Sequence, residues 1–539
     1  MGFQMSLLLH FMLLHIGTQG QDGPIVEVGV GSTVRGVEEY MPNSNKPVYN
    51  FMGIPFAAPP VGDLRFQPPQ EIPLWTGELD GTDFGDICPN VIPLLPAMSE
   101  NCLFLNVWTS STSQNANMAV MVWMFGGAFQ LGDGDIYEGT EFATLEDVVV
   151  VTFNYRVGVL GFLTMGDSNA PGNAGILDQR MALQWVQRHI RSFGGNPDAV
   201  TIFGESAGAM SVSFHLVSPM SRGLYLRAIG QSGVATTCGA ICVHTTEVAV
   251  NRSFVIAESV GCPQSDSDGV TACLRNLDWE DIELHSFEYL PGPHLDGTFF
   301  TDWPLSTYST GEFNRVDYLL GFNQDEGYIF MGDAEPTREN IATLIREYLA
   351  IIYPENLDAI FQACMDVYVD YDSMVTDEDY ERAYSYFIGD KLFLGQIHDF
   401  ARKHSVHATT FLYYFNHRPF WSEMPTWATA SHAHEIPYVF GEPFTDDTTL
   451  EFSEAGGVLS RQMMTYWANF AKTGNPNGNG LPAWPQMNCS STNYLELVPN
   501  PRTGERYEPE RMRLWVDTIP ALDTYRSGTY RGMPWACPS

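Results

Sequence analysis

The stretch AVTIFGESAGAMSVSFHLV, residues 199–217, joins a strand pattern to a helix pattern through one sharp turn. Its first five residues form an apolar run typical of a strand that is buried on both faces of a sheet. In the turn, Gly204 and Gly208 flank Ser206, and glycine is needed where a turn is strained and neighbouring backbone approaches closely. A strand, a serine between two glycines and a helix together predict a nucleophile elbow, which exposes its serine at the end of a sheet.

Two further strand patterns precede this turn, VMVWMF at 120–125 and VVVVTFNY at 148–155. Between the second of them and the turn, apolar residues recur every three or four positions over 177–193, which predicts a helix. Gly194 and Gly195 end that pattern. Strand, helix and strand in this order predict a parallel crossover. The fold class is therefore α/β, with a large, mostly parallel, twisted sheet flanked by helices.

A serine hydroxyl attacks a carbonyl group only when a nearby base takes its proton and an acid orients that base. In folds with a nucleophile elbow, the acid and then the base follow the serine along the chain. Downstream, GFNQDEGYIF contains Asp325 and Glu326, and SHAHEIPYVFG contains His432 and His434. The residue pattern alone does not decide between Asp325 and Glu326 as the acid, or between His432 and His434 as the base.

The attacked carbonyl oxygen also needs donors for its developing negative charge, usually main-chain N–H groups in a glycine turn. VMVWMFGGAFQLG places Gly126, Gly127 and Ala128 directly after a strand pattern and upstream of the serine. We expect this turn, together with the N–H group of Ala207, to form an oxyanion hole. A plain connecting turn is the alternative interpretation.

The chain is strongly acidic, with 27 Lys and Arg against 64 Asp and Glu and a formal net charge of −37. This charge disfavours nucleic acid and anionic membranes as partners. It favours solubility or, alternatively, the steering of cationic ligands. The 539 residues would suffice for two or three average domains. However, no repeat or linker-like composition divides them, and we expect one domain over 21–539.

Residues 6–16, SLLLHFMLLHI, form an apolar run that is too short to span a bilayer and is followed by small and polar residues. This predicts a secretory signal peptide over 1–20. No later run of about 18 apolar residues and no C-terminal anchor or retention signal follows. We therefore expect a secreted, extracellular protein without a membrane anchor. Export makes the sequons at Asn251 and Asn488 candidate glycosylation sites.

Export also allows disulfides to form among the nine cysteines. Cys88 with Cys102, and Cys262 with Cys273, are close in sequence and would each close a surface loop. Because nine is odd, at least one thiol is free or bonded to another chain. Cys537 is the natural candidate for an intermolecular bond, which would make a homo-oligomer. A free thiol or an internal bond is the alternative for Cys537, and the sequence leaves open the pairing of Cys238, Cys242, Cys364, Cys489 and Cys537.

Several longer segments carry a family resemblance. They are GIPFAAPPVGDLRF at 53–66, SENCLFLNVW at 99–108, GNAGILDQRMALQWVQRHIRSFGGNPDAVTIFGESAGA at 172–209, NQDEG at 323–327, YFNHR at 414–418 and HAHEIPYVFG at 432–441. On these segments, the chain resembles the type-B carboxylesterase and cholinesterase family over nearly all of its mature length. The resemblance implies the α/β-hydrolase fold.

The same resemblance implies a role for each candidate residue. It implies Ser206 as the nucleophile, Glu326 as the acid and His432 as the base. The family's oxyanion donors match Gly127, Ala128 and Ala207. The resemblance also implies an ion pair between Arg65 and Glu100 and the disulfides Cys88–Cys102 and Cys262–Cys273. A zinc motif H-E-x-x-H at 434–438 is incomplete, because Tyr438 stands where the second histidine would be.

Departures from the cholinesterase pattern bear on the substrate. Cholinesterases hold choline by cation–π attraction to an aromatic residue in the first disulfide loop, and the loop between Cys88 and Cys102 contains none. Ile329 replaces a second aromatic residue of their choline site. The resemblance places the acyl pocket around Tyr289, and Phe330 follows Ile329 in the candidate pocket. These changes favour neutral, apolar esters.

The sequence therefore predicts a secreted serine carboxylesterase that hydrolyses small-molecule esters through an acyl-serine intermediate, without a metal or an organic cofactor. A cholinesterase and a neutral-lipid lipase are alternative enzymes. A catalytically silent adhesion-type member of the same fold is the alternative outside enzymes. Because all three positions of the catalytic triad are filled, the sequence favours the enzyme.

Overall fold

The structure is a computed structural model. It describes residues 23–41, 46–91, 97–237, 243–263, 266–286, 289, 291–446 and 449–523. The predicted signal peptide over 1–20 lies outside the described residues. The same is true of Cys238, Cys242 and Cys537.

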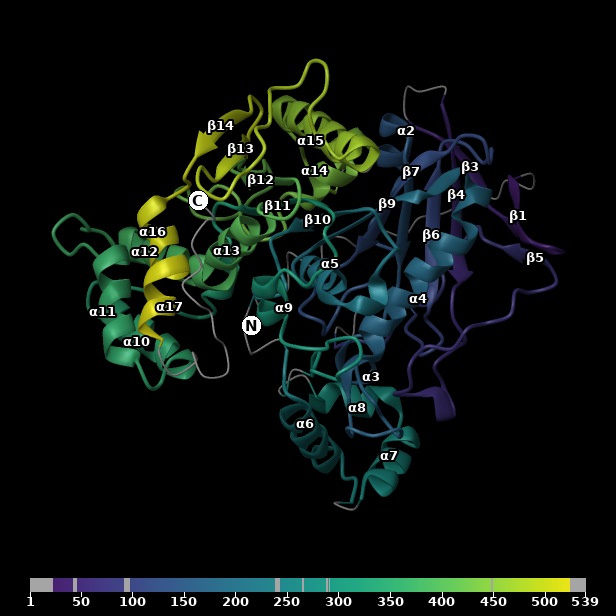
Figure 1. Ribbon diagram of the computed structural model, residues 1–539, viewed down its shortest axis with the longest axis horizontal. Helices are drawn as coiled ribbons and strands as arrows, with labels where there is room; N and C mark the ends of the chain where they lie inside the picture. The colour runs from purple at the N-terminus through teal and green to yellow at the C-terminus, as the bar shows by residue number, and fades with distance from the viewer. Residues whose placement is uncertain are drawn as a thin grey trace.

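An 11-stranded sheet runs through the molecule in the order β14-β13-β12-β11-β10-β9-β7-β8-β6-β4-β3 (Figure 1). All neighbours from β8 across to β13 pair in parallel, and the outer pairs are antiparallel. The predicted α/β sheet is thus confirmed. Its strands are β3 (Val37–Tyr40), β4 (Pro47–Pro55), β6 (Phe104–Thr109), β7 (Met118–Met124), β8 (Val149–Phe153), β9 (Gly195–Glu205), β10 (Arg227–Gln231), β11 (Asp317–Asn323), β12 (Thr410–Phe415), β13 (Asn493–Leu497) and β14 (Arg502–Glu505).

A second, three-stranded sheet of β1 (Ile25–Gly29), β2 (Ser32–Arg35) and β5 (Gly77–Asp80) lies at one end of the molecule. Helices surround the large sheet. They are α2 (Thr140–Glu146), α3 (Gly158–Phe162), α4 (Ala174–His189), α5 (Ala207–Val217), α6 (Thr246–Ser259), α7 (Ser267–Arg275), α8 (Trp279–Ser286), α9 (Pro304–Thr310), α10 (Ile341–Ile352), α11 (Leu357–Tyr368), α12 (Asp377–Gly389), α13 (Gly395–His404), α14 (Ile436–Phe440), α15 (Glu454–Thr473), α16 (Pro509–Arg513) and α17 (Ile519–Leu522).

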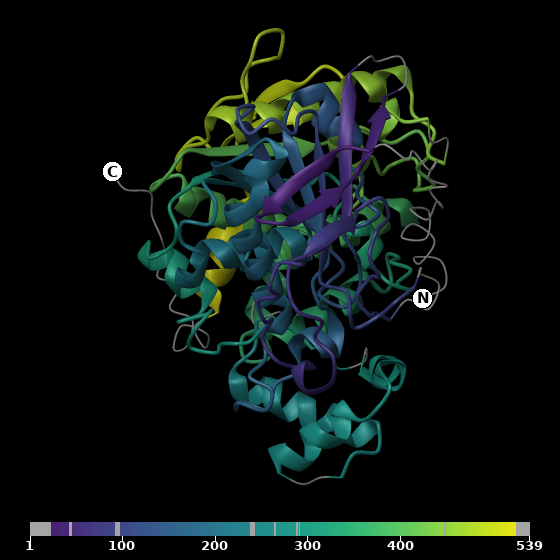
Figure 2. The ribbon, with the colours of Figure 1, turned by 90° about the vertical axis from the view of Figure 1, so that its right-hand side faces the viewer.

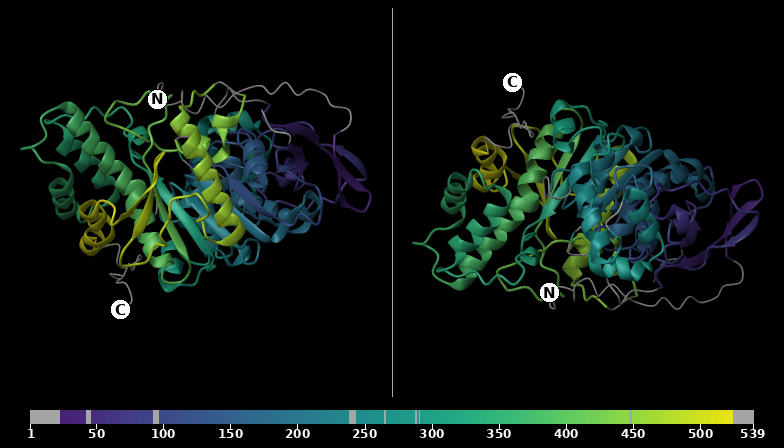
Figure 3. Two further views of the ribbon diagram at one scale, coloured as in Figure 1. Left: turned by 90° about the horizontal axis from the view of Figure 1, so that it is seen from above. Right: turned by 90° about the horizontal axis from the view of Figure 1, so that it is seen from below.

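Two groups of helices stand apart from those that cover the sheet. Helices α10, α11, α12 and α17 lie together at the end opposite β1 and β5 (Figures 1 and 3). They enclose a hydrophobic cluster of their own, which includes Leu349, Ile360, Phe387 and Trp515. We call this group, with α16, the helical subdomain. Helices α6, α7 and α8 form a lobe that projects from another side of the molecule (Figure 2).

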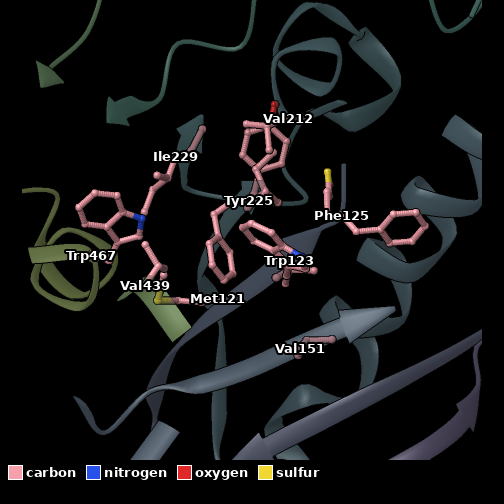
Figure 4. Packing of buried hydrophobic residues seen from close by; sticks show 14 of the residues in the cluster. Met121, Trp123, Phe125, Val151, Val212, Tyr225, Ile229, Val439 and Trp467 are labelled. Carbon is pink, nitrogen blue, oxygen red and sulfur yellow. The ribbon is translucent and has the colours of Figure 1, made fainter. Parts of the chain in front are cut away.

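The main core lies between the central strands and the helices packed on them. Figure 4 shows Met121 of β7, Ile229 of β10, Val212 of α5 and Trp467 of α15 within this core. The Trp467 indole N–H also donates a hydrogen bond of 2.9 Å to the side-chain oxygen of Gln231. Because a buried polar group needs a partner, this bond fixes α15 on the sheet. The neighbour of the strand that leads to Ser206, β10, is therefore attached to α15.

Two disulfides close loops, Cys88–Cys102 and Cys262–Cys273, and these are the pairs that the resemblance implies. Arg65 connects the two loops. Its guanidinium donates to the Glu100 carboxylate at 2.7 Å and to the carbonyl oxygens of Leu274 and Leu277 at 2.9 and 2.6 Å. The ion pair is mostly buried, so its hydrogen bonds are less screened than those of an exposed pair.

The remaining described cysteines differ from each other. Cys489 is disulfide-bonded, whereas Cys364 is a free thiol in the core of the helical subdomain. Burial raises the pKa of Cys364 to about 12, which leaves it as an unreactive thiol at neutral pH. A free thiol is therefore present at Cys364, and the intermolecular role predicted for Cys537 stays a prediction.

Glycosylation at the two sequons also stays a prediction. Asn251 on α6 and Asn488 on a loop are both exposed, as glycan attachment requires. Across the described segments, the structure contains no helix with the length and apolar character needed to cross a membrane.

Candidate active site

Ser206 occupies a strained turn between β9 and α5, with φ 54° and ψ −121°. Side chains other than glycine rarely adopt positive φ, and such strain is typical of functional sites. A Cβ atom at Gly204 would lie 2.5 Å from the carbonyl oxygen of Met124, and one at Gly208 would lie 1.9 Å from the same oxygen. Only glycine therefore fits at either position. Ser206 is partly exposed although both of its neighbours are buried.

The close approach at Gly208 gives a stability prediction. We expect Gly208→Ala to destabilise the protein by at least about 3 kcal/mol, because the obstructing atom belongs to the backbone of β7 and cannot change rotamer. The measurement is the midpoint of thermal unfolding. Gly457→Ala in α15 is the matched control, since a Cβ there would meet nothing within 4 Å. That variant should gain about 0.5–1 kcal/mol from the better helix propensity of alanine. Equal midpoints for both variants would contradict the packing argument.

His432 and Glu326 meet at the carboxyl ends of two neighbouring parallel strands. Glu326 follows β11 and His432 follows β12, and an isolated bridge between Asp325 and Ser431 holds the two loops together. The Nδ1 atom of His432 lies 2.5 Å from a carboxylate oxygen of Glu326. The other oxygen of Glu326 accepts hydrogen bonds from the N–H group of Asn323 at 2.7 Å and the hydroxyl of Ser232 at 2.5 Å. Both carboxylate oxygens are therefore used, and the acid is held in one orientation.

The second ring nitrogen of His432 faces the segment that carries Ser206. Its Nε2 atom lies 3.0 Å from a carboxylate oxygen of Glu205 and makes no hydrogen bond within the described residues. Burial lowers the pKa of His432, but the Glu205 and Glu326 carboxylates outweigh burial and raise it. The two carboxylates therefore stabilise the imidazolium ion that forms when His432 takes a proton.

The glycine turn predicted as an oxyanion hole packs against the elbow. A Cβ atom at Gly126 would lie 3.2 Å from Cβ of Ser206. The next two residues, Gly127 and Ala128, have φ values of 102° and 56°. Within the described residues, no acceptor is bonded to the N–H group of Gly127, Ala128 or Ala207. Three main-chain donors next to the serine are therefore available to a ligand.

The arrangement of a partly exposed serine, a histidine held by a carboxylate and free N–H groups suits attack on a carbonyl carbon. A family model described as the carboxylesterase family matches residues 22–515. The chain belongs to the carboxylesterase family. Its relatives include an acylcarnitine hydrolase of Mus musculus, 38% identical over 94% of each chain. They also include a pyrethroid hydrolase (Ces2e) of Rattus norvegicus, 36% identical over 96% of this chain and 94% of the relative. A cocaine esterase of Homo sapiens is 36% identical over 94% of each chain.

Family membership establishes that this protein is a carboxylic-ester hydrolase with the α/β-hydrolase fold. In this carboxylesterase, the structure separates the alternatives within each candidate pair. Asp325 accepts hydrogen bonds from the N–H groups of Thr429 at 2.7 Å and Ala430 at 3.3 Å, so it joins its loop to the one that carries His432. Nδ1 of His434 accepts from the N–H group of Ser431 at 3.2 Å, and burial lowers the pKa of His434 to about 3. Neither residue takes part in the contact between Glu326 and His432.

The predicted pocket residues of the carboxylesterase fall in different places. The Phe330 ring lies 5.1 Å from the His432 ring between centroids and is 40% exposed, so it borders the site. Ile329 is half-buried beside it. Tyr289 instead packs against a separate cluster formed with Leu160, Val270 and other residues. No contact within the described residues supports the predicted role of Tyr289 in the acyl pocket, and that role stays a prediction.

Two residues near His432 were not predicted from the sequence. Glu205 could have been noticed, because it directly precedes Ser206 in the chain. No sequence pattern marked Phe393 as part of the site. Its ring lies 4.6 Å from that of His432 between centroids. It is one apolar residue among many in a helical pattern, 39 positions before the histidine.

A cavity of about 600 Å³ opens between the 166–172 loop and α4, bordered by Arg180, Met181 and His294. None of its lining residues is a candidate catalytic residue of the carboxylesterase. We place the substrate at Ser206 because the strained turn, the oriented histidine and the free N–H groups occur there.

Proposed function

We propose that this carboxylesterase is a secreted serine esterase that hydrolyses neutral, apolar small-molecule esters through an acyl-serine intermediate. The observation that carries the proposal is the position of the His432 imidazole. One ring nitrogen is bonded to Glu326, and the other makes no hydrogen bond to any described residue and lies 3.0 Å from the carboxylate of Glu205, the residue before Ser206. A nucleophile, a base and an orienting acid are the parts that acyl transfer requires.

Acylation follows from these positions. The Ser206 hydroxyl oxygen attacks the ester carbonyl carbon while Nε2 of His432 takes the hydroxyl proton. Glu326 stabilises the resulting imidazolium through Nδ1, and the carbonyl oxygen, now negative, accepts hydrogen bonds from the N–H groups of Gly127, Ala128 and Ala207. The bond between the carbonyl carbon and the alcohol oxygen then breaks. The alcohol leaves with the proton from Nε2, and the acyl group stays on the serine.

Deacylation repeats the steps with water as the nucleophile. His432 takes a proton from water, and the hydroxide oxygen bonds to the acyl carbon. The bond from the acyl carbon to the Ser206 oxygen breaks, and that oxygen recovers the proton from Nε2. A carboxylic acid is released, and it ionises in water. The residues of the chain account for every proton in both halves of the reaction, so the proposal includes no metal or organic cofactor.

Neutral, apolar esters are proposed as the substrates because the rim of the site is apolar. Phe330 packs against His432 and follows the apolar Ile329 in the chain. The sequence between Cys88 and Cys102 contains no aromatic residue for a quaternary ammonium group. The names of the relatives refer to an acylcarnitine, pyrethroids and cocaine, which are chemically diverse. They support a broad esterase more than one dedicated to a single alcohol.

The test compares kcat/KM for three substrates: 1-naphthyl acetate, acetylthiocholine and an emulsified long-chain triglyceride. We expect naphthyl acetate to exceed acetylthiocholine at least about tenfold, since apolar contacts alone discriminate by about that factor. A preference for acetylthiocholine would identify a cholinesterase, and activity confined to the emulsion would identify a lipase. Both results would overturn the proposed substrate class. Hydrolysis of none of the three would overturn the assignment of a general serine esterase.

A further inference from the structure

The imidazole of His432 packs against two aromatic rings. Phe393 lies 4.6 Å away between ring centroids, with a tilt of 36° between the planes. Phe330 lies 5.1 Å away and meets the imidazole edge to face at 72°. The two phenyl rings also contact each other at 5.2 Å. The three rings thus form a closed cluster, which restricts rotation of the imidazole.

Phe393 comes from an unusual element. It lies in a π-helical turn, Asp390–Leu394, between α12 and α13. A π-helical turn contains an extra residue relative to an α-helical turn, and such turns occur frequently at functional sites. The extra residue changes which side chains face inward. Phe393 is buried in the main core, whereas Phe387 of α12, six residues earlier, is buried in the helical subdomain.

Strong contacts fix this turn in place. The buried carboxylate of Asp390 accepts two hydrogen bonds from the Arg511 guanidinium, both at 2.6 Å, and one from the Tyr368 hydroxyl at 2.5 Å. Nearby, the backbone of α12 touches the residue after the candidate acid. A Cβ atom at Gly327 would lie 2.5 Å from the backbone nitrogen of Gly389. The helical subdomain is therefore docked directly on the loop that carries Glu326.

We propose that Phe393 is a positioning residue for the catalytic base, through which the helical subdomain holds the His432 imidazole in line with Glu326. The proposal rests on the proposed function, in which His432 is that base. Glu326 binds one edge of the imidazole, and the two phenyl rings pack on it from other directions. Loss of the Phe393 ring leaves space in which the imidazole can turn or water can reach the bond between Nδ1 and Glu326. Either change lowers the fraction of enzyme ready to take the serine proton.

The experiment compares Phe393→Ala and Phe393→Leu with Phe387→Leu in the full chain. Phe387 is a matched control, because it is a buried phenylalanine of the adjacent helix whose ring contacts are with residues such as Tyr368 and Trp515 rather than with His432. Four quantities are measured: kcat and KM for 4-nitrophenyl acetate, the midpoint of thermal unfolding, and the low-field proton resonance of the Nδ1–H group bonded to Glu326. The resonance reports the orientation of the imidazole directly.

We expect Phe393→Ala to lower kcat about 10- to 100-fold with KM within about twofold, as for a misplaced catalytic group. Its low-field resonance should broaden or disappear. Phe393→Leu should lower kcat about five- to tenfold and keep the resonance, because leucine refills most but not all of the space. Phe387→Leu should lower the unfolding midpoint but leave kcat within about threefold of the parent and the resonance unchanged, since it acts on stability alone.

Three results would overturn the inference. One is a kcat for Phe393→Ala equal to that of Phe387→Leu. Another is a raised KM at unchanged kcat, which would make Phe393 a wall of the substrate pocket. The third is a lower kcat with an unchanged resonance. If Phe393→Ala does not fold, Phe393→Leu decides, because a kcat equal to that of Phe387→Leu again contradicts the inference. Failure of the proposed function is seen separately, as a parent enzyme that a fluorophosphonate does not label at Ser206.

Discussion

Ser206→Ala is expected to lower kcat for ester hydrolysis by at least about 10⁴-fold, because removal of a nucleophile leaves only binding and the oxyanion hole to act. The turn itself should survive. Alanine also has a Cβ atom, and the backbone contacts of residue 206 involve its N–H and C=O groups, including a 2.9 Å hydrogen bond to Gln231. The loss of activity should therefore come without a matching loss of stability. Measurements of kcat and of the thermal unfolding midpoint check both statements.

Ser213→Ala is the matched control for this substitution. Ser213 lies two turns further along α5, and its hydroxyl donates only to main-chain oxygens of the same helix, those of Ala209 and Met210. Its activity should stay within about threefold of the parent, as for most substitutions outside a site. Mass spectrometry after fluorophosphonate treatment should detect an adduct on the parent and on Ser213→Ala but not on Ser206→Ala. An adduct that persists in Ser206→Ala would place the nucleophile elsewhere.

Glu326→Gln should lower kcat by about 10⁴-fold, the loss typical when an uncharged amide replaces the acid of a catalytic triad. The surrounding donors determine how the amide is oriented. Asn323 and Ser232 both donate to one oxygen of Glu326, so the amide oxygen must take that position. The NH₂ group then faces Nδ1 of His432 and donates to it. The imidazole proton moves to Nε2, and no lone pair remains there to accept the serine proton.

The neighbouring carboxylate provides the control for this prediction. Asp325→Asn keeps an oxygen that can accept the hydrogen bonds now made by Thr429 and Ala430, so kcat should stay within about threefold of the parent. The comparison uses kcat for 4-nitrophenyl acetate and the low-field proton resonance, which should be lost only in Glu326→Gln. Retention of more than about a tenth of the activity by Glu326→Gln would mean that the acid contributes far less than triads in general require.

Much of the fold followed from local patterns in the sequence. Apolar runs predicted β7, β8 and β9, and a helical period predicted α4 together with the 3-10 turn Ile190–Phe193 that follows it. Boundaries were less accurate. β9 begins at Gly195 instead of residue 199, because Gly195 pairs with Met118 of β7 across an irregular register. A local pattern contains no information about the partner strand, so it could not place this boundary.

The candidate site also contains some residues that the sequence could predict and others that it could not. The position of Ser206 between two glycines was readable because the turn imposes its own residue requirements. The choice of Glu326 over Asp325 was not readable from the residues, since it depends on which carboxylate the 429–430 backbone occupies. Among the sequence arguments, only the family resemblance identified Glu326 as the acid. Phe393 could not be found at all, because the extra residue of a π-helical turn alters the helical period that sequence patterns use.

The arginine that joins the two disulfide loops has a consequence for engineering. Arg65 binds each loop beside its second cysteine, at Glu100 before Cys102 and at Leu274 after Cys273. In the first loop, Glu100 is the residue between the cysteines that makes this attachment, whereas the attachment to the second loop lies beyond Cys273. The first loop can therefore be treated as a replaceable cassette, with Glu100 and both cysteines kept, so that new sequences can be grafted without redesign of the scaffold. The second loop does not allow this, because Val270 within it is fully buried.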